Sequence, residues 1–328
     1  MGKLRLTLAV GDYDITRPLI DGTVTPSGID LVVVTAPSPE RHWRMMRRRE
    51  FDVCELSLGS YVAERSAYGE DGGGLVGLPA FPHRRFRHGY VFVPASSGAR
   101  APADLAGGSV GLRTWQTTAG IWLRGMLAEH YGLDLRSVRW VAQDPEDVPR
   151  DLPAGLELAR VPEGKLVTEM TASGELAGLL YPELPQQVRS GDGSIRRLFA
   201  DPKAAEQEYY RRTEIFPIMH TVVVKAEIAN AFPWAPRALL DAFTEAKRLA
   251  MRRLDNPRTV SLAWLRTLQD EEREVLGPDP WRYGWDDVNE QTLATFLRYS
   301  FEQGVAVRQL TPGELFWPAT LDRIPHYV

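Results

Sequence analysis

The chain has 328 residues, of which 44% are hydrophobic and 25% charged, and its formal net charge is −4. This length suits about two domains, and this composition is typical of a globular protein with ordinary hydrophobic cores. The negative charge argues against a nucleic-acid binder, which needs a basic surface. No segment approaches the ~18 continuous apolar residues of a membrane span.

The N-terminal residues lead directly into a predicted strand and lack the hydrophobic segment and cleavage site of a signal peptide. We therefore expect a cytoplasmic protein without membrane contact. The single cysteine, Cys54, excludes an internal disulfide and any metal site built from several cysteines. Its place in the apolar run 51–58 predicts a buried strand residue. The sequence contains no P-loop, nucleophile-elbow or zincin motif.

The first part of the chain alternates between strand and helix patterns. Apolar runs predict strands over 4–10, 29–35, 51–56, 75–80 and 89–93. Helical spacing and capping residues predict helices over 16–21, 38–50 and 57–68. Glycines 72–74 mark a break between the last helix and the strand that follows it.

The middle of the chain shows the same alternation, and the end is mainly helical. Strands are expected over 110–112, 138–141, 176–181, 195–199 and 221–224. Helices are expected over 119–131, 165–173, 204–212, 236–254, 260–268 and 288–303. The segment 143–153 contains three prolines and predicts a surface loop.

Alternating strands and helices predict parallel sheets whose carboxyl-terminal edges bind ligands. The late strand 221–224 follows the middle part and is expected to return to the first sheet. We therefore predict an α/β protein with two lobes, one formed by residues 1–93 with 217–328 and the other by residues 94–216. The two sheets should be separate, with a cleft between the lobes.

The segment 109–132 combines a strand, a polar turn and a helix that ends at Gly132. Free backbone N–H groups and the helix dipole favour an anion at such a turn, and an arginine can clamp a carboxylate with two hydrogen bonds. The candidate ligand residues of this turn are Arg113, Gln116, Thr117 and Thr118. The alternative is that a threonine only caps the helix.

The residues that lead into this segment, 101–112, resemble the start of the second lobe in type II periplasmic-binding-protein folds. In that fold the N-terminus of the following helix faces the interlobe cleft. The resemblance implies a two-lobed type II periplasmic-binding-protein-like fold, with the Arg113 turn as part of its ligand site.

Two of the six histidines stand at the predicted crossings between the lobes. His88 precedes a strand, and His220 ends the segment that returns to the first lobe. Imidazole titrates nearest to neutral pH, so both are candidate acid–base residues, although a histidine beside a strand can also be purely structural. The positions of His42, His130 and His326 predict surface residues, and His83 stays undecided.

Other candidates lie at the ends of predicted strands. Glu55 and Ser57 end the third strand, where an α/β lobe presents ligand contacts, or else they only cap the next helix. Tyr13, Asp14 and Arg17 occupy the first strand-to-helix turn, which can equally be a simple capped turn. Arg85 adds a positive charge in the link before His88, and we include it among the candidate substrate ligands.

Motifs along nearly the whole chain resemble the 4,5-dihydroxyphthalate decarboxylase family. They lie at residues 8–22, 51–57, 86–88, 116–132, 209–220 and 314–318. The sequence departs from the family pattern at Arg113-Thr114, where Pro-Glu is common, and at 181–185, where the family has a basic turn. These departures indicate a relocated carboxylate or a different acid.

The resemblance implies a decarboxylase that protonates the ring carbon bearing the carboxylate and then releases carbon dioxide. His88 and His220 would be its acid–base pair, with Asp14 and Glu55 as catalytic partners that orient them or contact the hydroxyl. Tyr13, Arg17, Ser57, Arg85 and the Arg113 turn would bind the substrate.

This route needs no cofactor, and a divalent ion chelated by the histidines and a catechol stays open as an alternative. The expected partner is a small-molecule aromatic carboxylate, neither nucleic acid nor membrane, and the oligomeric state, a homo-oligomer included, is left open. The competing hypotheses are a non-catalytic solute-binding protein for an aromatic carboxylate and a pyrimidine-synthase-like enzyme of cofactor synthesis, although the iron-binding motif of the latter is absent from the sequence.

Overall fold

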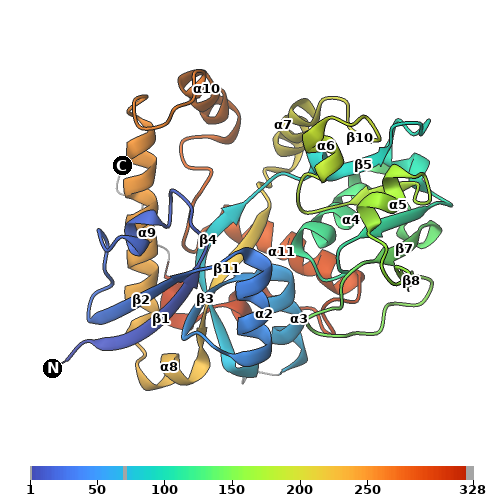
Figure 1. Ribbon diagram of the computed structural model, residues 1–328. Helices are drawn as coiled ribbons and strands as arrows, with labels where there is room; N and C mark the ends of the chain where they lie inside the picture. The colour runs from blue at the N-terminus through green and yellow to red at the C-terminus, as the bar shows by residue number, and fades with distance from the viewer. Residues whose placement is uncertain (1, 69–71, 323–328) are drawn as a thin grey trace. The chain divides into compact units, whose positions relative to one another are not determined.

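The computed structural model describes residues 2–68 and 72–322. The chain forms two compact units (Figure 1). The first unit contains Met1–Arg84, Glu214–Ala294 and Leu310–Val328, and the second contains Arg85–Thr213 and Thr295–Gln309. Each unit is built around its own sheet.

The first unit contains a five-stranded sheet with the strand order β2-β1-β3-β11-β4. Its strands are β1 (Leu4–Val10), β2 (Ile29–Thr35), β3 (Val53–Ser57), β4 (Leu75–Arg84) and β11 (Ile218–Lys225). The strands β1, β2 and β3 are parallel, and β11 runs antiparallel between β3 and β4. The helices of this unit are α1 (Arg17–Ile20), α2 (Ser38–Arg48), α3 (Leu58–Ala67), α8 (Ala226–Ala231), α9 (Ala235–Leu254) and α10 (Leu265–Leu276). Residues of α11 (Asp287–Glu302) belong to both units.

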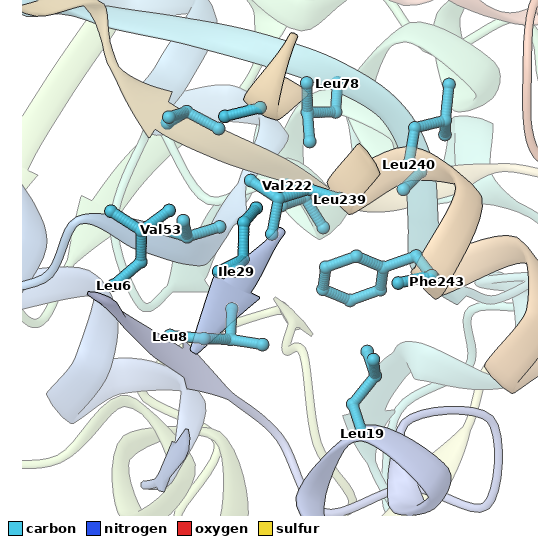
Figure 2. Close-up of a cluster of buried hydrophobic side chains, with 14 of the residues drawn as sticks. Leu6, Leu8, Leu19, Ile29, Val53, Leu78, Val222, Leu239, Leu240 and Phe243 are labelled. Carbon is cyan, nitrogen blue, oxygen red and sulfur yellow. The ribbon is translucent and has the colours of Figure 1, made fainter. Parts of the chain in front are cut away.

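The core of the first unit lies between its sheet and α9 (Figure 2). Alternate residues of β1, Leu6 and Leu8, share one buried cluster with Leu239, Leu240 and Phe243 of α9. Burying a side chain of this size stabilises the fold by about 1.5–3 kcal/mol. The inner strands β3 and β11 are buried along nearly their whole length, and α2 packs against β3. Because both faces of these inner strands are covered, their residues do not alternate between buried and exposed.

The second unit contains a six-stranded sheet with the order β10-β5-β9-β6-β7-β8. Its strands are β5 (Val91–Pro94), β6 (Ser109–Leu112), β7 (Arg139–Ala142), β8 (Glu157–Arg160), β9 (Gly178–Leu180) and β10 (Ile195–Arg197). The strands β9, β6, β7 and β8 are parallel, and β5 is antiparallel to β9 and β10. The helices are α4 (Thr118–Tyr131), α5 (Val167–Ala172), α6 (Gln186–Ser190) and α7 (Pro202–Thr213). Short 3₁₀ helices occur in both units. Those of the first unit are η1 (Gly72–Gly74), η5 (Pro312–Leu315) and η6 (Pro318–Thr320), and those of the second are η2 (His88–Tyr90), η3 (Pro102–Leu105) and η4 (Leu135–Ser137).

The structure differs from the sequence expectations in several details. The strand expected at 89–93 pairs with β9 and β10, so it belongs to the second sheet rather than the first. Residues 295–309 also group with the second unit, although we expected them in the first. The helix expected at 260–268 begins only at Leu265 and continues to Leu276. Both sheets are mixed rather than parallel, because β11 and β5 run against their neighbours.

Two other expectations agree with the structure. The strands β1 and β6 lie in different sheets, and β11 pairs with the first-unit strands β3 and β4.

Within the described part of the chain, none of the helices combines the length and the apolar character needed to cross a membrane.

Candidate functional site

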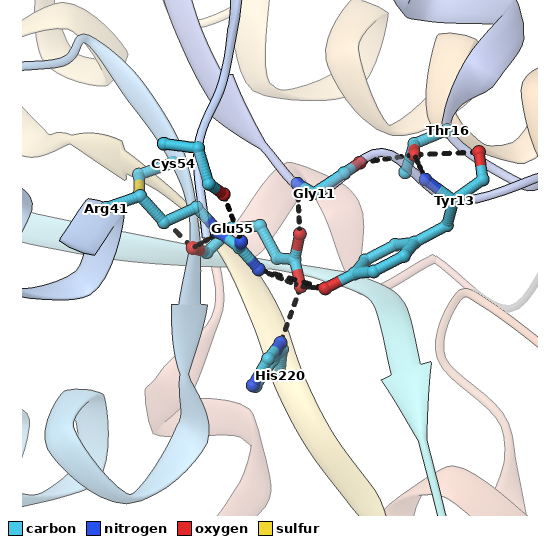
Figure 3. A network of polar contacts seen from close by, with 8 residues as sticks. Gly11, Tyr13, Thr16, Arg41, Cys54, Glu55 and His220 are labelled. Atoms are coloured by element: carbon cyan, nitrogen blue, oxygen red, sulfur yellow. Dashed lines mark hydrogen bonds and ion pairs between the residues drawn. The ribbon is translucent and has the colours of Figure 1, made fainter. Parts of the chain in front are cut away.

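A buried carboxylate network lies in the first unit, with Glu55 of β3 at its centre (Figure 3). The backbone N–H of Gly11 donates to Glu55 Oε2 at 2.8 Å. Three groups surround Oε1: the Tyr13 hydroxyl at 3.1 Å, Arg41 Nη2 at 2.6 Å and His220 Nδ1 at 2.5 Å. The Glu55 side chain has no exposed area, so these partners replace the water that would otherwise stabilise its charge.

Arg41 reaches the network from α2. Three residues at helical spacing, Arg41, His42 and Met45, are buried on this helix. The Arg41 guanidinium also donates to the backbone carbonyls of Glu55 at 3.2 Å and Ala36 at 2.8 Å. It therefore holds the carboxylate and the chain that leads into its own helix in one arrangement.

The turn after β1 positions the tyrosine. The Thr16 hydroxyl donates to the Gly11 carbonyl at 2.6 Å and accepts from the Tyr13 N–H at 3.0 Å. A Cβ atom on Gly11 would overlap the Tyr13 ring, so this position requires glycine for the ring to lie close to the backbone. The turn thereby directs the Tyr13 hydroxyl to Glu55 (Figure 3).

His220 lies on β11 between two neighbouring strands. In the register it stands opposite Ser57 of β3 and opposite His83 of β4. Its ring lies edge-on to His83, with 4.6 Å between the ring centroids, and edge-on to His42, with 4.8 Å. Three imidazoles therefore gather beside the Glu55 carboxylate.

The expectation that His42 lies on the surface is wrong. His42 is only 8% exposed, because the face of α2 that carries Arg41 also carries His42 toward the sheet. His130 is partly buried, and His326 lies outside the described residues.

The site residues lie at one edge of the first sheet. Gly11 follows the carboxyl end of β1, Glu55 and Ser57 end β3, and His83 lies near the end of β4. This is the edge where α/β sheets bind ligands. A pocket of about 390 Å³ opens beside the network. It is lined by Gly11, Asp12, Tyr13, Thr35, Ala36, Pro37, Ser38 and Arg41.

The network sets the charge states of its members. Burial, followed by the nearby Glu55 carboxylate, raises the pKa of Tyr13, so its hydroxyl stays protonated and donates. Burial opposes the charge of Arg41, but Glu55 and Tyr13 outweigh it and the pKa of Arg41 is raised. Burial, with the charges of His220 and Arg41, lowers the pKa of His42 well below its usual value, which keeps this imidazole neutral.

Two further candidates of the first unit make contacts outside the network. The Asp14 carboxylate accepts from the Ile15 N–H at 2.8 Å within the turn. Arg17 forms an ion pair with Asp12 at 2.5 Å, and both side chains are about half exposed. Their proposed roles in catalysis and substrate binding remain predictions.

The Arg113 turn of the second unit is held mainly by its own chain. Arg113 Nε lies 2.7 Å from Asp144 Oδ2. The side-chain amide of Gln116 pairs with the N–H and the carbonyl of Val148. The hydroxyls of Thr114 and Thr117 lie 2.6 Å apart.

An internal carboxylate, that of Glu146, already accepts the N–H groups of Trp115 and Gln116 at 2.7 and 2.9 Å. Thr117 stands at the N-cap of α4, and the buried Thr118 is the first residue of the helix.

A narrow hollow, too small to admit a water molecule, lies beside this turn. Arg113, Thr114 and Thr117 line it together with Tyr181 and Pro182. Both segments where the sequence departs from the decarboxylase pattern therefore contribute to one hollow of the second unit. The expected role of the turn in carboxylate binding stays a prediction.

His88 is completely buried in the second unit. The rings of Tyr131, Phe199 and Tyr209 surround it, with centroids 5.7, 5.2 and 5.4 Å from that of the imidazole. Burial lowers the pKa of His88 to about 4, so it is neutral at physiological pH. Arg85 donates to the Tyr90 hydroxyl at 2.9 Å. The catalytic role of His88 and the binding role of Arg85 stay predictions.

Within residues 2–68 and 72–322, no group of three or more histidine, cysteine, aspartate or glutamate side chains is arranged to hold a metal ion. Cys54 is a buried residue of β3, as expected, and burial raises the pKa of its thiol.

Local sequence patterns did not mark Arg41, His42 and His83 as site residues. Arg41 and His42 stand within a run of charged residues whose pattern resembles a solvated helix face. His83 follows two prolines, which predict the end of a strand. Only the position of α2 on β3 and the pairing of β4 with β11 bring these side chains to Glu55 and His220.

Relatives with assigned functions decide the family. No model of a known protein family matches the chain. The chain is 38% identical over 330 residues to 4,5-dihydroxyphthalate decarboxylase of Comamonas testosteroni, covering 98% of this chain and 99% of that protein. The chain belongs to the 4,5-dihydroxyphthalate decarboxylase family. It is also 35% identical over 217 residues to the Pseudomonas putida enzyme of the same name, covering 64% of this chain and 83% of that protein.

Solved structures similar to this family member share its two-lobed fold at low sequence identity. The alkanesulfonate-binding protein SsuA of Xanthomonas axonopodis pv. citri is 14% identical, with a TM-score of 0.56 over 97% of this chain and 98% of that protein. The desulfurization enzyme DSZB is 16% identical, with a TM-score of 0.50 over 97% and 98%. These structures show that the fold is that of periplasmic binding proteins, and that it occurs in binding proteins and in enzymes alike.

Proposed function

We propose that this chain is a carboxy-lyase that removes carbon dioxide from a dihydroxylated aromatic acid of the 4,5-dihydroxyphthalate type, and that Glu55 and His220 form its proton-transfer pair. The observation that carries the proposal is the 2.5 Å contact between His220 Nδ1 and the buried Glu55 carboxylate, in a member of this decarboxylase family. A carboxylate at Nδ1 fixes the orientation of an imidazole and stabilises its protonated form.

The chemistry explains why such a pair is useful. Direct loss of carbon dioxide from an aromatic ring would leave an unstabilised aryl anion. Protonation of the ring carbon that bears the carboxylate avoids this anion, because a ring hydroxyl para to that carbon becomes a conjugated ketone as it loses its proton. The carbon–carboxylate bond then breaks, its electron pair returns to the ring, and aromaticity is restored. His220 would donate the proton to the ring carbon from Nε2.

The other groups of the network would keep His220 ready for this step. Arg41 balances the charge of Glu55, so the carboxylate is available to the imidazole. Tyr13 and Arg41 line the 390 Å³ pocket and connect it to the buried pair. The substrate carboxylates would be bound by positively charged or hydroxyl side chains, for which Arg17, Ser57, Arg85 and the Arg113 turn remain the candidates.

The alternative is a binding protein for an aromatic carboxylate, and the fold shared with alkanesulfonate-binding proteins is compatible with it. A binding protein needs positive charge that complements the ligand carboxylate, but it does not require a carboxylate–imidazole pair for proton transfer. The ligand in both cases is a small aromatic carboxylate. A cytoplasmic location and a metal-free reaction are further parts of the proposal, and cell fractionation and chelator treatment would test them. Light scattering would determine the oligomeric state, which the proposal leaves open.

Release of carbon dioxide from 4,5-dihydroxyphthalate and from related hydroxylated aromatic acids is the decisive test. We expect the purified protein to release carbon dioxide and, in deuterium oxide, to place deuterium at the carbon that lost the carboxylate. His220→Gln should lower kcat by about 10²–10⁴-fold, the usual contribution of a general acid. His130→Gln, in a partly buried histidine outside the network, is the control. Binding without carbon dioxide release from any of the acids would support the binding protein instead.

A further inference from the structure

His83 shares the site of the proposed proton-transfer pair. It stands opposite His220 in the β4–β11 register, and the centroids of the two rings are 4.6 Å apart. The His83 ring also lies beside that of Tyr13, with 6.2 Å between centroids. His83 is only partly buried, and Tyr13 is a residue of the pocket lining. Tyr13 therefore connects the pocket to both imidazoles, because its hydroxyl shares Glu55 Oε1 with His220 and its ring lies beside that of His83.

An irregular segment of β4 brings His83 to this place. Two steps along β11, from Val222 to His220, correspond to five steps along β4, from Leu78 to His83. Pro79 lies within this irregular segment, as does a second proline at position 82, and neither has an N–H group for the ladder. Such irregularities are frequent next to active sites, where they change the direction of a side chain.

The chain on both sides of His83 is anchored. The Pro79 carbonyl accepts from the Gly284 N–H at 2.7 Å. The next residue after His83, Arg84, donates to the carbonyls of Phe216 at 3.1 Å and Arg282 at 2.9 Å. These contacts hold the irregular segment in one conformation. The His83 ring is thus placed by a rigid element, as a catalytic group requires.

The charges around the two rings favour different protonation states. His220 is next to the Glu55 carboxylate, which favours an imidazolium. A second imidazolium at this ring separation would be repelled, so His83 is favoured as the neutral base when His220 is the charged acid. The titratable and charged groups around the pair are Tyr13 from the β1–α1 turn, Arg41 and His42 from α2, Glu55 from β3 and Arg84 from β4 itself.

We propose that His83 is the second catalytic residue, the general base that accepts the proton of the ring hydroxyl while His220 protonates the ring carbon. The hydroxyl oxygen becomes a carbonyl, the carbon–carboxylate bond breaks, and its electron pair restores the ring. The proton on His83 then returns to the oxygen, and solvent reprotonates His220. Atoms and charges balance without a cofactor. This inference rests on the proposed decarboxylase function and adds a residue to it.

The test is the pH dependence of kcat/KM in His83→Gln, with wild-type carbon dioxide release established first. A neutral base and a charged acid produce a bell-shaped profile, whose acidic limb belongs to the base. We expect His83→Gln to lower kcat by about 10²–10⁴-fold and to lose the acidic limb, while the alkaline limb remains. His130→Gln should keep the wild-type profile.

A folded His83→Gln protein with the wild-type kcat and an unchanged pH profile of kcat/KM would overturn the role of His83 and leave the decarboxylase assignment intact. An inactive wild type would instead refute the proposed function itself. If His83→Gln does not fold, the wild-type protein provides a second measurement. The NMR titration of the His83 Cε1–H should shift when a hydroxylated aromatic product binds, and an unchanged titration would contradict the proposal.

Discussion

Arg41 supplies the positive charge that stabilises the buried Glu55 carboxylate. The two side chains are 1% and 0% exposed and their charged atoms are 2.6 Å apart. Arg41→Leu would remove the arginine from the buried Glu55 carboxylate, which would keep the contacts of Gly11, Tyr13 and His220. Removing one partner of a buried ion pair typically destabilises a protein by about 3–5 kcal/mol. Urea unfolding should show this loss.

A matched control lies on the same helix. Arg44 contacts the exposed Glu40 and Glu50, at 2.9 and 2.5 Å. Because water and salt screen exposed pairs, Arg44→Leu should lower the unfolding free energy far less than Arg41→Leu. Equal losses for both variants would mean that burial does not decide the value of the Arg41 ion pair.

The Arg113 turn is the element on which the expected carboxylate binding depends. Its arginine is partly exposed and lines the narrow hollow, while Gln116 is engaged with the backbone of Val148. Arg113→Ala should weaken substrate binding by about 1.5–3 kcal/mol, the usual contribution of a hydrogen bond to a charged group. Calorimetry with the substrate would measure it, and Arg136→Ala is a control at an exposed arginine of the same unit. An unchanged affinity in Arg113→Ala would remove the turn from the site.

The strand β4 shows how an element can be longer than its sequence predicts. We expected it to end at residue 80, but it continues to Arg84 although two prolines interrupt its ladder. Prolines are tolerated at the edge of a sheet, and β4 is the last strand in the order of the first sheet. The extension carries His83 into register with His220.

Stability of the whole molecule should depend on pH through His88. The pKa of His88 is lowered from 6.5 to about 4 by burial and by the nearby His130 and Arg212. Well above pH 6.5 both the folded and the unfolded states are neutral at this residue. As the pH falls from 6.5 to about 4, only the unfolded state takes up the proton. The free energy of unfolding therefore falls, by up to about 3 kcal/mol in total.

His88→Phe should therefore flatten the fall of the unfolding free energy between pH 6.5 and 4, which urea titrations at several pH values would measure. The same variant addresses catalysis, because a loss of about 10²–10⁴-fold in kcat at unchanged stability would support the predicted catalytic role. An equally steep fall in wild type and variant would contradict the assignment of this acid sensitivity to His88.

Local patterns in the sequence determined the alternation of strands and helices, the return of β11 and the candidate residues at strand ends, because periodicity and turn chemistry act over a few neighbouring residues. They identified Tyr13, Glu55 and His220 separately. Tertiary structure alone decided that these three meet, since strand order and register are set by pairing between distant segments. The same pairing brought His83 to the site, and the packing of α2 on β3 added Arg41.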